Sequence, residues 1–210
     1  MVYKLYYFDF RGLGETARLL FHAAGQEFED VRFNPEQWPE YKAQSPTGKA
    51  PFLEVDGHTI VESFAIYRFL ANRFGYAGKD EFEKALVDST ADFFRNATTD
   101  TRMYLIVTAG RAEGDKDALY KEKFLPALEK TFPYIEQVLK KSGSGFIAPS
   151  GLTWADLFIV ESLTTMLNLA PQVAEKYPFV ADYKKRVHEH PKIKDYVASR
   201  KPTSSLSEHL

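Results

Sequence analysis

The stretch YYFDFRGLGETARLLF, at positions 6–21, combines residue types and spacing from which two kinds of chemistry are built. A G-x-G-x-x-A motif at positions 12–17 separates an expected strand from an expected helix, which is the spacing of a dinucleotide-binding turn. Asp30 lies near the place where such a fold carries its ribose-binding acid. Tyr6 and Tyr7, just before the glycines, offer hydroxyl donors instead. The turn is therefore either a phosphate cradle or part of a site built around a tyrosine.

The secondary structure expected around this turn disfavours the dinucleotide hypothesis. Four residues separate Tyr7 from Gly12, whereas in a dinucleotide fold the first glycine comes directly at the strand end. Farther along, FLEV and TIV flank Asp56-Gly57, which predicts a β-hairpin instead of further parallel β-α-β units. A glycine turn that enters a helix is also common without any ligand. We therefore expect no dinucleotide site.

The composition narrows the classes of function. The chain has 210 residues, of which 44% are apolar and 27% charged, and its formal net charge is −2. This balance predicts no nucleic-acid partner and no membrane partner, and no apolar run is long enough to span a bilayer. Without any cysteine, disulfides, thiolate metal ligands and a cysteine nucleophile are excluded. The lack of cysteine and of a membrane-spanning run predicts a cytoplasmic protein. His188 and His190 lack an evident third ligand, so we expect no metal site.

The order of local patterns predicts an α/β domain at residues 1–78. Strand-like and helix-like stretches alternate there in the order β-α-β-α-β-β-α. Gly25 and Gly75 are expected to end helices, and Ser63 is expected to cap the start of one. The mixture of one parallel crossover and one hairpin indicates a small mixed sheet.

The remaining residues, 79–210, predict an all-helical domain. It begins with a tract free of Gly and Pro that reaches Ala109 and reads as one long helix. Around Thr153 and Asp156, the motif LTWADL predicts a capping box that starts a strongly apolar core helix. We assign folding roles, and no chemistry, to these two polar residues.

Five motifs resemble those of cytosolic glutathione transferases, most closely the sigma class and its nematode-type members. They span nearly the whole chain in family order, and they are YFDFRG (7–12), WPEYK (38–42), PTGKAPFLEVDG (46–57), ESFAIYRFLA (62–71) and LTWADL (152–157). The resemblance implies a thioredoxin-like, glutathione-binding domain followed by a helical domain that contributes a hydrophobic-substrate site. It implies that glutathione is the co-substrate and that its thiolate is conjugated to hydrophobic electrophiles.

The same resemblance implies that Tyr7 is the catalytic residue. A free thiol has a pKa of about 8.5, so only a few per cent of it is ionised at neutral pH. A hydroxyl that donates to the sulfur favours the anion. Tyr6 is the competitor, but side chains alternate along a strand, so the two tyrosines face opposite sides. Leu13 stands where the mammalian sigma member has an arginine near the thiol, which leaves the thiolate more dependent on Tyr7.

The resemblance also implies how glutathione binds. It implies a cis peptide bond at Ala50–Pro51, beside which the cysteinyl backbone of glutathione pairs like a short strand. The γ-glutamyl carboxylate is expected at the helix start after Glu62, where free N–H groups favour an anion. The implied glutathione-binding residues are Phe8, Trp38, Lys42, Gly48, Lys49, Ala50, Pro51, Glu62, Ser63 and Asn96.

Two of these residues depart from the sigma pattern. Glu62 replaces the usual glutamine, and Asn96 replaces an acid that usually reaches across the dimer. The glutamyl amine is positively charged and needs a nearby anion more than it needs a particular carrier of that charge. We therefore hypothesise that Glu62 supplies the charge from within the same subunit.

The second substrate and the assembly are less closely defined. Candidate hydrophobic-substrate residues are Leu13, Met103, Phe158 and Leu206. Two alternatives to conjugation stay open: a glutathione-dependent prostaglandin isomerase or peroxidase, and a non-catalytic binding protein for planar hydrophobes such as haem. The family is dimeric, and Thr47 in place of an aromatic key residue indicates a polar homodimer interface that is sensitive to salt.

Overall fold

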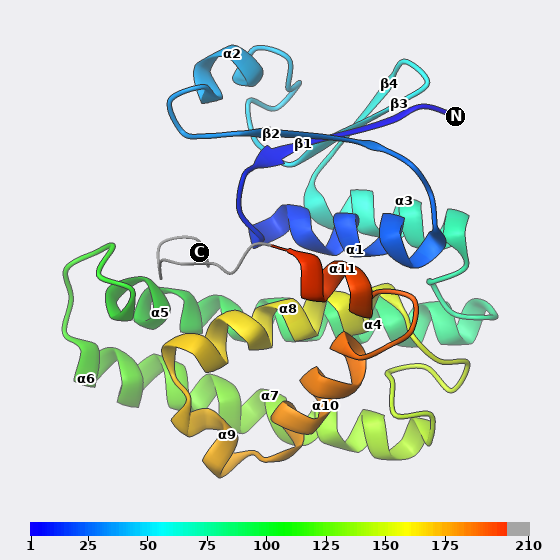
Figure 1. Ribbon diagram of the computed structural model, residues 1–210. Coiled ribbons are helices and arrows are strands. Elements are labelled where there is room, and N and C mark those ends of the chain that lie inside the picture. Colours follow the sequence, from blue (N-terminus) through cyan, green and yellow to red (C-terminus); the bar gives the residue numbers. More distant parts are fainter. Residues whose placement is uncertain (201–210) are drawn as a thin grey trace. The chain divides into compact units, whose positions relative to one another are not determined.

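The computed structural model describes residues 1–200, which fall into two units (Figure 1). The first unit comprises Met1–Tyr76 together with the segment that begins at His190, and the second comprises Ala77–Glu189. Within residues 1–200, no helix combines the length and the apolar character that crossing a membrane requires.

The first unit is built on a four-stranded sheet in the order β2-β1-β3-β4. The strands are β1 (Tyr3–Phe8), β2 (Glu29–Phe33), β3 (Phe52–Val55) and β4 (His58–Val61). β1 and β2 run parallel, whereas β3 is antiparallel to both β1 and β4. Asp56 and Gly57 join β3 to β4 with φ angles of 46° and 84°, as a tight hairpin turn requires. The predicted hairpin is confirmed.

Helices cover both faces of this sheet. They are α1 (Glu15–Ala24), α2 (Trp38–Lys42) and α3 (Ser63–Phe74), and Figure 1 shows α1 beside α3 on one face and α2 on the other. Tyr3 of β1 packs edge-on against Phe21 of α1 at 5.3 Å and Phe74 of α3 at 5.9 Å. α1 and α3 end at Gly25 and Gly75, both with positive φ, as predicted. The order β-α-β-α-β-β-α is confirmed.

The second unit is helical, and α8 packs against both α4 and α10. Its helices are α4 (Glu81–Thr98), η2 (Thr99–Thr101), α5 (Arg102–Thr108), α6 (Lys116–Leu119), the π turn η3 (Tyr120–Phe124), α7 (Leu125–Ser142), α8 (Trp154–Leu169), α9 (Gln172–Lys176) and α10 (Phe179–His188). The long helix predicted to reach Ala109 is interrupted by η2. There Thr98 and Thr101 donate hydroxyl hydrogen bonds back to the carbonyls of Phe94 and Thr98, at 2.7 and 2.6 Å, a pattern that bends helices.

The segment that begins at His190, predicted as part of the helical domain, makes its contacts with the first unit. It contains α11 (Lys194–Ser199) and groups with the first unit. The reason is a set of contacts with α1: the Tyr196 ring stacks on His22 at 3.8 Å, and its hydroxyl donates to the Glu15 carboxylate at 3.0 Å. Local sequence patterns carry no information on a contact between residues 181 positions apart.

The predicted capping box is present at the start of α8. Asp156 is fully buried and accepts hydrogen bonds from the Thr153 N–H at 2.7 Å and the Thr153 hydroxyl at 2.6 Å. The same carboxylate also accepts from the Ile147 N–H at 2.8 Å and the Tyr183 hydroxyl at 2.7 Å. One side chain therefore joins the preceding loop, the start of α8 and α10.

Asp156→Ala should destabilise the fold severely, because it leaves several buried donors without an acceptor. We expect a loss of about 3 kcal/mol or more in the free energy of unfolding, measured by urea denaturation. Asp115→Ala is the matched control. Asp115 caps α6 through one exposed bond to the Ala118 N–H at 3.0 Å, so its loss should cost about 1 kcal/mol. Equal losses for the two variants would contradict this role of Asp156.

Candidate functional site

One edge of the sheet gathers the ends of three strands. In the observed register Tyr6 of β1 lies opposite Phe52 of β3, and Phe52 lies opposite Val61 of β4. At this edge, therefore, β1 ends, β3 begins and β4 ends. The predicted site residues adjoining these strand ends are Tyr7, Phe8, Ala50, Pro51, Glu62 and Ser63.

Tyr7 lies against the glycine turn, and it explains the spacing of that turn. Its side chain is buried, and its ring packs edge-on against Phe10 at 5.4 Å. A Cβ atom at Gly12 would lie 2.5 Å from the Tyr7 hydroxyl oxygen, and one at Gly14 would lie 2.5 Å from its Cδ1. No real side chain fits at such distances. The two glycines therefore make room for a tyrosine, and the motif does not require a phosphate ligand.

The Tyr7 hydroxyl is oriented by the backbone of Leu13. The Leu13 N–H donates to the Tyr7 hydroxyl oxygen at 3.0 Å, and the Leu13 carbonyl accepts a short hydrogen bond from the hydroxyl of Tyr67 on α3. An N–H bond to a phenol oxygen polarises the phenol and strengthens its own O–H as a donor. The two tyrosines thus hold the two successive peptide groups that flank Leu13. The contact made by Tyr67 was not predicted from the sequence.

Tyr6 faces the opposite side of the sheet, as the alternation along β1 predicts. Its ring stacks on Phe52 at 4.4 Å, and its hydroxyl donates to the Glu54 carboxylate at 3.0 Å. Burial, reinforced by this negative neighbour, raises the pKa of Tyr6 to about 12. The Tyr6 hydroxyl therefore donates to Glu54 on one side of the sheet. The Tyr7 hydroxyl lies on the other side, at the glycine turn.

The aromatic and basic residues predicted for the glycine end of glutathione lie near this edge. Trp38 stacks on Phe33 at 5.4 Å and contacts Phe8 at 5.6 Å, in a cluster that also holds Ala50. Lys42, at the end of α2, is exposed and passes close to Gly48, where a Cβ would lie 3.5 Å from the Lys42 Cε.

The loop before the Ala50–Pro51 bond is closed by Ser45, a residue that the sequence analysis did not single out. Its buried hydroxyl donates to the Lys49 carbonyl at 2.7 Å and accepts from the Lys49 N–H at 3.3 Å. A serine just before a Pro-Thr-Gly turn is the available sequence signal, because serine hydroxyls commonly bind nearby backbone groups in turns. The Ala50–Pro51 peptide bond is cis, as expected.

The N-cap of α3 is Glu62, whereas the sequence predicted Ser63 at this position. Ser63 is the first residue of α3, and Glu62 takes the N-cap position, with its carbonyl accepting from the Ile66 N–H at 3.0 Å. Glu62 has φ 66° and ψ 119°, a backbone conformation that costs about 1–3 kcal/mol in a residue with a side chain. Such strain is found at ligand-binding positions, and the Glu62 side chain is exposed.

The other predicted site residues belong to the second unit or lie beyond the described chain. Asn96 is exposed on α4, and Met103 is 50% exposed on α5. Phe158 on α8 is largely buried and packs edge-on against Phe94 at 5.9 Å. Leu206 lies outside the described residues. Among residues 1–200, no group of three histidine, aspartate or glutamate side chains is arranged to hold a metal ion.

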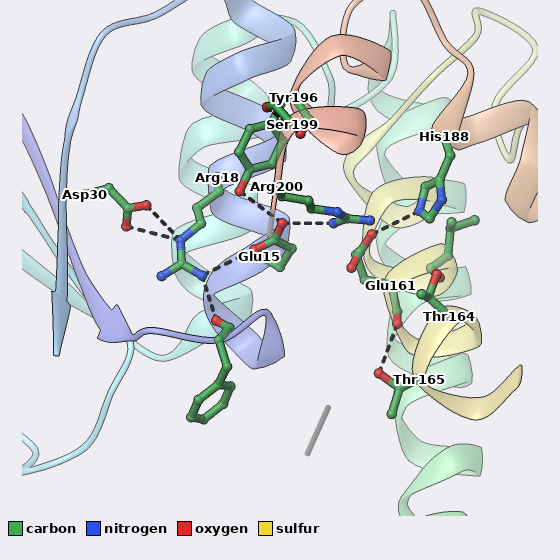
Figure 2. Close-up of polar contacts among 12 residues, drawn as sticks. Glu15, Arg18, Asp30, Glu161, Thr164, Thr165, His188, Tyr196, Ser199 and Arg200 are labelled. Atoms are coloured by element: carbon green, nitrogen blue, oxygen red, sulfur yellow. Dashed lines mark hydrogen bonds and ion pairs between the residues drawn. The ribbon is translucent and has the colours of Figure 1, made fainter. Parts of the chain in front are cut away.

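A buried guanidinium, also missed from the sequence, supports the loop that follows Tyr7 (Figure 2). Arg18 is fully buried. Its Nε donates to the Asp30 carboxylate at 3.0 and 3.1 Å, while Nη1 and Nη2 donate to the carbonyls of Phe10 at 2.8 Å and Phe8 at 3.2 Å. Asp30, which the dinucleotide hypothesis assigned to a ribose, is thus a partner of Arg18.

Comparison with known proteins identifies the family. Family models match twice, the glutathione S-transferase N-terminal domain over residues 3–72 and the C-terminal domain over residues 99–200. Glutathione S-transferase 1 of Ascaris suum is 45% identical over 201 residues, which cover 96% of this chain and 98% of that relative. The chain belongs to the glutathione S-transferase family. The fold class and the transferase assignment made from the five motifs are therefore confirmed.

Solved structures of glutathione transferases share this fold, and one of them is described by its class and another by its assembly. The structure of the transferase from Ascaris lumbricoides has a TM-score of 0.92, with 45% identity and coverage of 97% of this chain and 99% of that one. A transferase of Haemonchus contortus described as Nu-class has a TM-score of 0.87 at 40% identity, covering 95% and 97% of the two chains. One of Necator americanus described as monomeric has a TM-score of 0.90 at 42% identity, covering 97% and 100%.

Tyr67→Phe should weaken the orientation of the Tyr7 hydroxyl, because it removes the bond that holds the Leu13 carbonyl. We expect a loss of about 1 kcal/mol of folding stability together with a smaller fraction of ionised thiol in bound glutathione, read from thiolate absorbance at neutral pH. Tyr76→Phe is the matched control, since Tyr76, just after α3, likewise donates to a backbone carbonyl, that of Ala23 in α1, at 2.6 Å. A thiolate signal that changes equally in both variants would refute this role for Tyr67.

Proposed function

We propose that this transferase conjugates the thiolate of glutathione to hydrophobic electrophiles, and that the Tyr7 hydroxyl stabilises the thiolate. The observation that carries the proposal is the bond from the Leu13 N–H to the Tyr7 oxygen, at the position that matches the catalytic tyrosine of the family. A hydroxyl polarised in this way stabilises an anion better than a neutral thiol. Lowering a thiol pKa by about two units corresponds to about 2.7 kcal/mol.

The proposed glutathione site follows the sheet edge described above. The cysteinyl backbone pairs beside Ala50 and Pro51, and the γ-glutamyl carboxylate binds at the start of α3, where free N–H groups and the helix dipole favour an anion. Ser63 lies at that helix start. The glycine end extends toward Trp38, Lys42 and Lys49, with Phe8 and Gly48 shaping the surface between them.

Tyr7→Phe tests the catalytic assignment. It should leave the Kd for glutathione within about twofold, because the tripeptide is held mainly by its backbone and carboxylates, while the pKa of the bound thiol rises toward the free value of about 8.5. Thiolate absorbance across pH and turnover with an aromatic electrophile measure the two effects. Tyr6→Phe is the control and should change neither. A thiolate that persists in Tyr7→Phe would refute the assignment.

Glu62 is proposed to bind the γ-glutamyl amine in place of an acid at Asn96. Its strained backbone and exposed carboxylate support a role in ligand binding. The Glu62 side chain is exposed, so we expect an effect at the low end of the range for a charged hydrogen bond. Glu62→Gln should weaken glutathione binding by about 1.5 kcal/mol, or roughly tenfold, as measured by calorimetry.

Asn96 supplies the controls for this experiment. Asn96→Ala should have little effect on binding, and Asn96→Asp in the Glu62→Gln background should recover part of the loss. If Glu62→Gln binds glutathione as tightly as the parent protein, the charge lies elsewhere and the proposal fails.

For the second substrate we propose an apolar, adaptable surface that includes Leu13, Met103, Phe158 and Leu206. Leu13 and Met103 are 45% and 50% exposed, so their apolar side chains are accessible to a ligand. A panel of electrophiles with glutathione tests conjugation directly. Binding of glutathione without turnover of any electrophile would favour the alternative of a binding protein for planar hydrophobes, and turnover of prostaglandin or peroxide substrates alone would favour the isomerase or peroxidase.

We also propose the finer classification made from the motifs: a sigma-class transferase that acts as a homodimer in the cytoplasm. The support is the sequence WPEYK, the position of Thr47 and the absence of cysteine from the chain. Light scattering during gel filtration at low and high salt tests the assembly. A monomer at micromolar concentration and low salt would contradict the homodimer.

A further inference from the structure

A chain of ion pairs joins the C-terminal helix to the loop that follows Tyr7 (Figure 2). At its centre is the carboxylate of Glu15, which is buried at the start of α1. One of its oxygens binds Nη1 of Arg18 at 3.2 Å. The other oxygen accepts from the Tyr196 hydroxyl at 3.0 Å and from Nη1 of Arg200 at 2.9 Å. Tyr196 and Arg200, far along the sequence, thus supply two of the hydrogen-bond donors to the Glu15 carboxylate of α1.

Arg18 carries this connection onward to the site. The guanidinium that binds Glu15 also holds the carbonyls of Phe8 and Phe10. Those carbonyls lie on either side of Asp9, one at the end of β1 and the other in the loop before the glycine turn. The guanidinium carbon also lies 5.8 Å from the centre of the Tyr7 ring, within the range of a cation–π contact. The position of Arg18 therefore fixes both the loop and one face of the tyrosine.

The sharing of Arg18 makes its position sensitive to the other partners of Glu15. A buried carboxylate that loses hydrogen-bond donors is strongly destabilised. Without Tyr196 and Arg200, Glu15 would depend more heavily on Arg18, whose remaining bonds hold the loop. Burial, reinforced by the negative charge of Glu15, raises the pKa of Tyr196 well above its usual value, so this phenol stays a neutral donor across the physiological range.

We propose that Tyr196 and Arg200 are positioning residues for Tyr7. They act through Glu15 and Arg18, which hold the loop so that the Tyr7 hydroxyl meets the Leu13 N–H. The inference rests on the proposed function of Tyr7 in stabilising the thiolate. The C-terminal helix α11 thereby takes part in thiol activation indirectly, without any contact to glutathione.

The test measures the pKa of the bound glutathione thiol by thiolate absorbance across pH in Tyr196→Phe, Arg200→Gln and the double variant. We expect the pKa to rise by about half a unit in each single variant and by about one unit in the double variant, as loss of hydrogen bonding to an anion predicts. The Kd for glutathione should change less than twofold. Arg200→Lys keeps the positive charge, so the thiol pKa in this variant should stay close to that of the parent protein.

Matched controls separate positioning from general destabilisation. Tyr76→Phe removes a hydroxyl that binds the Ala23 carbonyl at the other end of α1. Arg186→Gln removes a guanidinium that binds the Gly145 carbonyl in the second unit. Both controls should lower the Tm to a similar degree as the test variants and leave the thiol pKa unchanged. If the test variants lower the Tm without moving the thiol pKa, the network is only structural and the inference is overturned.

A double-mutant cycle distinguishes this inference from the function on which it rests. In the Tyr7→Phe background, Arg200→Gln should cause no further rise in the thiol pKa, because its effect is transmitted through Tyr7. An additive rise would mean that Arg200 acts on the thiolate directly, and it would overturn the positioning role. If Tyr7→Phe alone leaves the thiolate intact, the proposed function fails and the inference fails with it. If Tyr7→Phe abolishes the thiolate and the α11 variants do not affect it, only the inference fails.

Discussion

The close approach of the Tyr7 ring to the backbone of the glycine turn is the constraint on which the first unit depends. A tyrosine in van der Waals contact with main-chain atoms leaves no space for side chains at Gly12 and Gly14. The same contact brings the Leu13 N–H within hydrogen-bonding distance of the phenol oxygen. One steric requirement therefore sets both the residue types of the turn and the electrostatic surroundings of the hydroxyl.

Buried charge in this unit is tolerated because the charges alternate in sign. An arginine without exposure to water is stable only where nearby acids and carbonyls replace its hydration. Arg18 has two such acids, and each acid in turn has a second cation or donor. The side chains that are ion-paired in succession are Arg200, Glu15, Arg18, Asp30, Arg32 and Asp9. It links the C-cap of α11, α1, β2 and the loop after β1 through three positive and three negative side chains.

The sequence predicted the fold well where local chemistry decides structure. The hairpin at Asp56-Gly57, the helix ends at Gly25 and Gly75 and the capping box at Asp156 each depend on residues only a few positions apart. The contrast between Tyr6 and Tyr7 also followed from strand alternation alone. These features were accessible because turns, caps and alternation are properties of short segments.

The rest depended on contacts between distant segments. The break at η2 reflects threonine hydroxyls that compete with the helix ladder, and helix propensity alone does not predict such competition. The hydroxyl of Tyr67 and the guanidinium of Arg18 are indistinguishable in sequence from ordinary core and helix residues. The G-x-G-x-x-A spacing was compatible with a phosphate ligand until the position of the Tyr7 ring explained the two glycines.

The return of the chain's last described segment to its first helix has a consequence for biosynthesis. A ribosome makes Glu15 and Arg18 well before Tyr196 and Arg200, and domains generally begin to fold from the N-terminal side during synthesis. Tyr196 and Arg200 are 181 and 185 residues downstream of Glu15. A nascent or prematurely ended chain can therefore assemble the sheet, but its Glu15 carboxylate lacks these two donors. The first unit therefore obtains all of its contacts only after the second unit, Ala77–Glu189, has been synthesised.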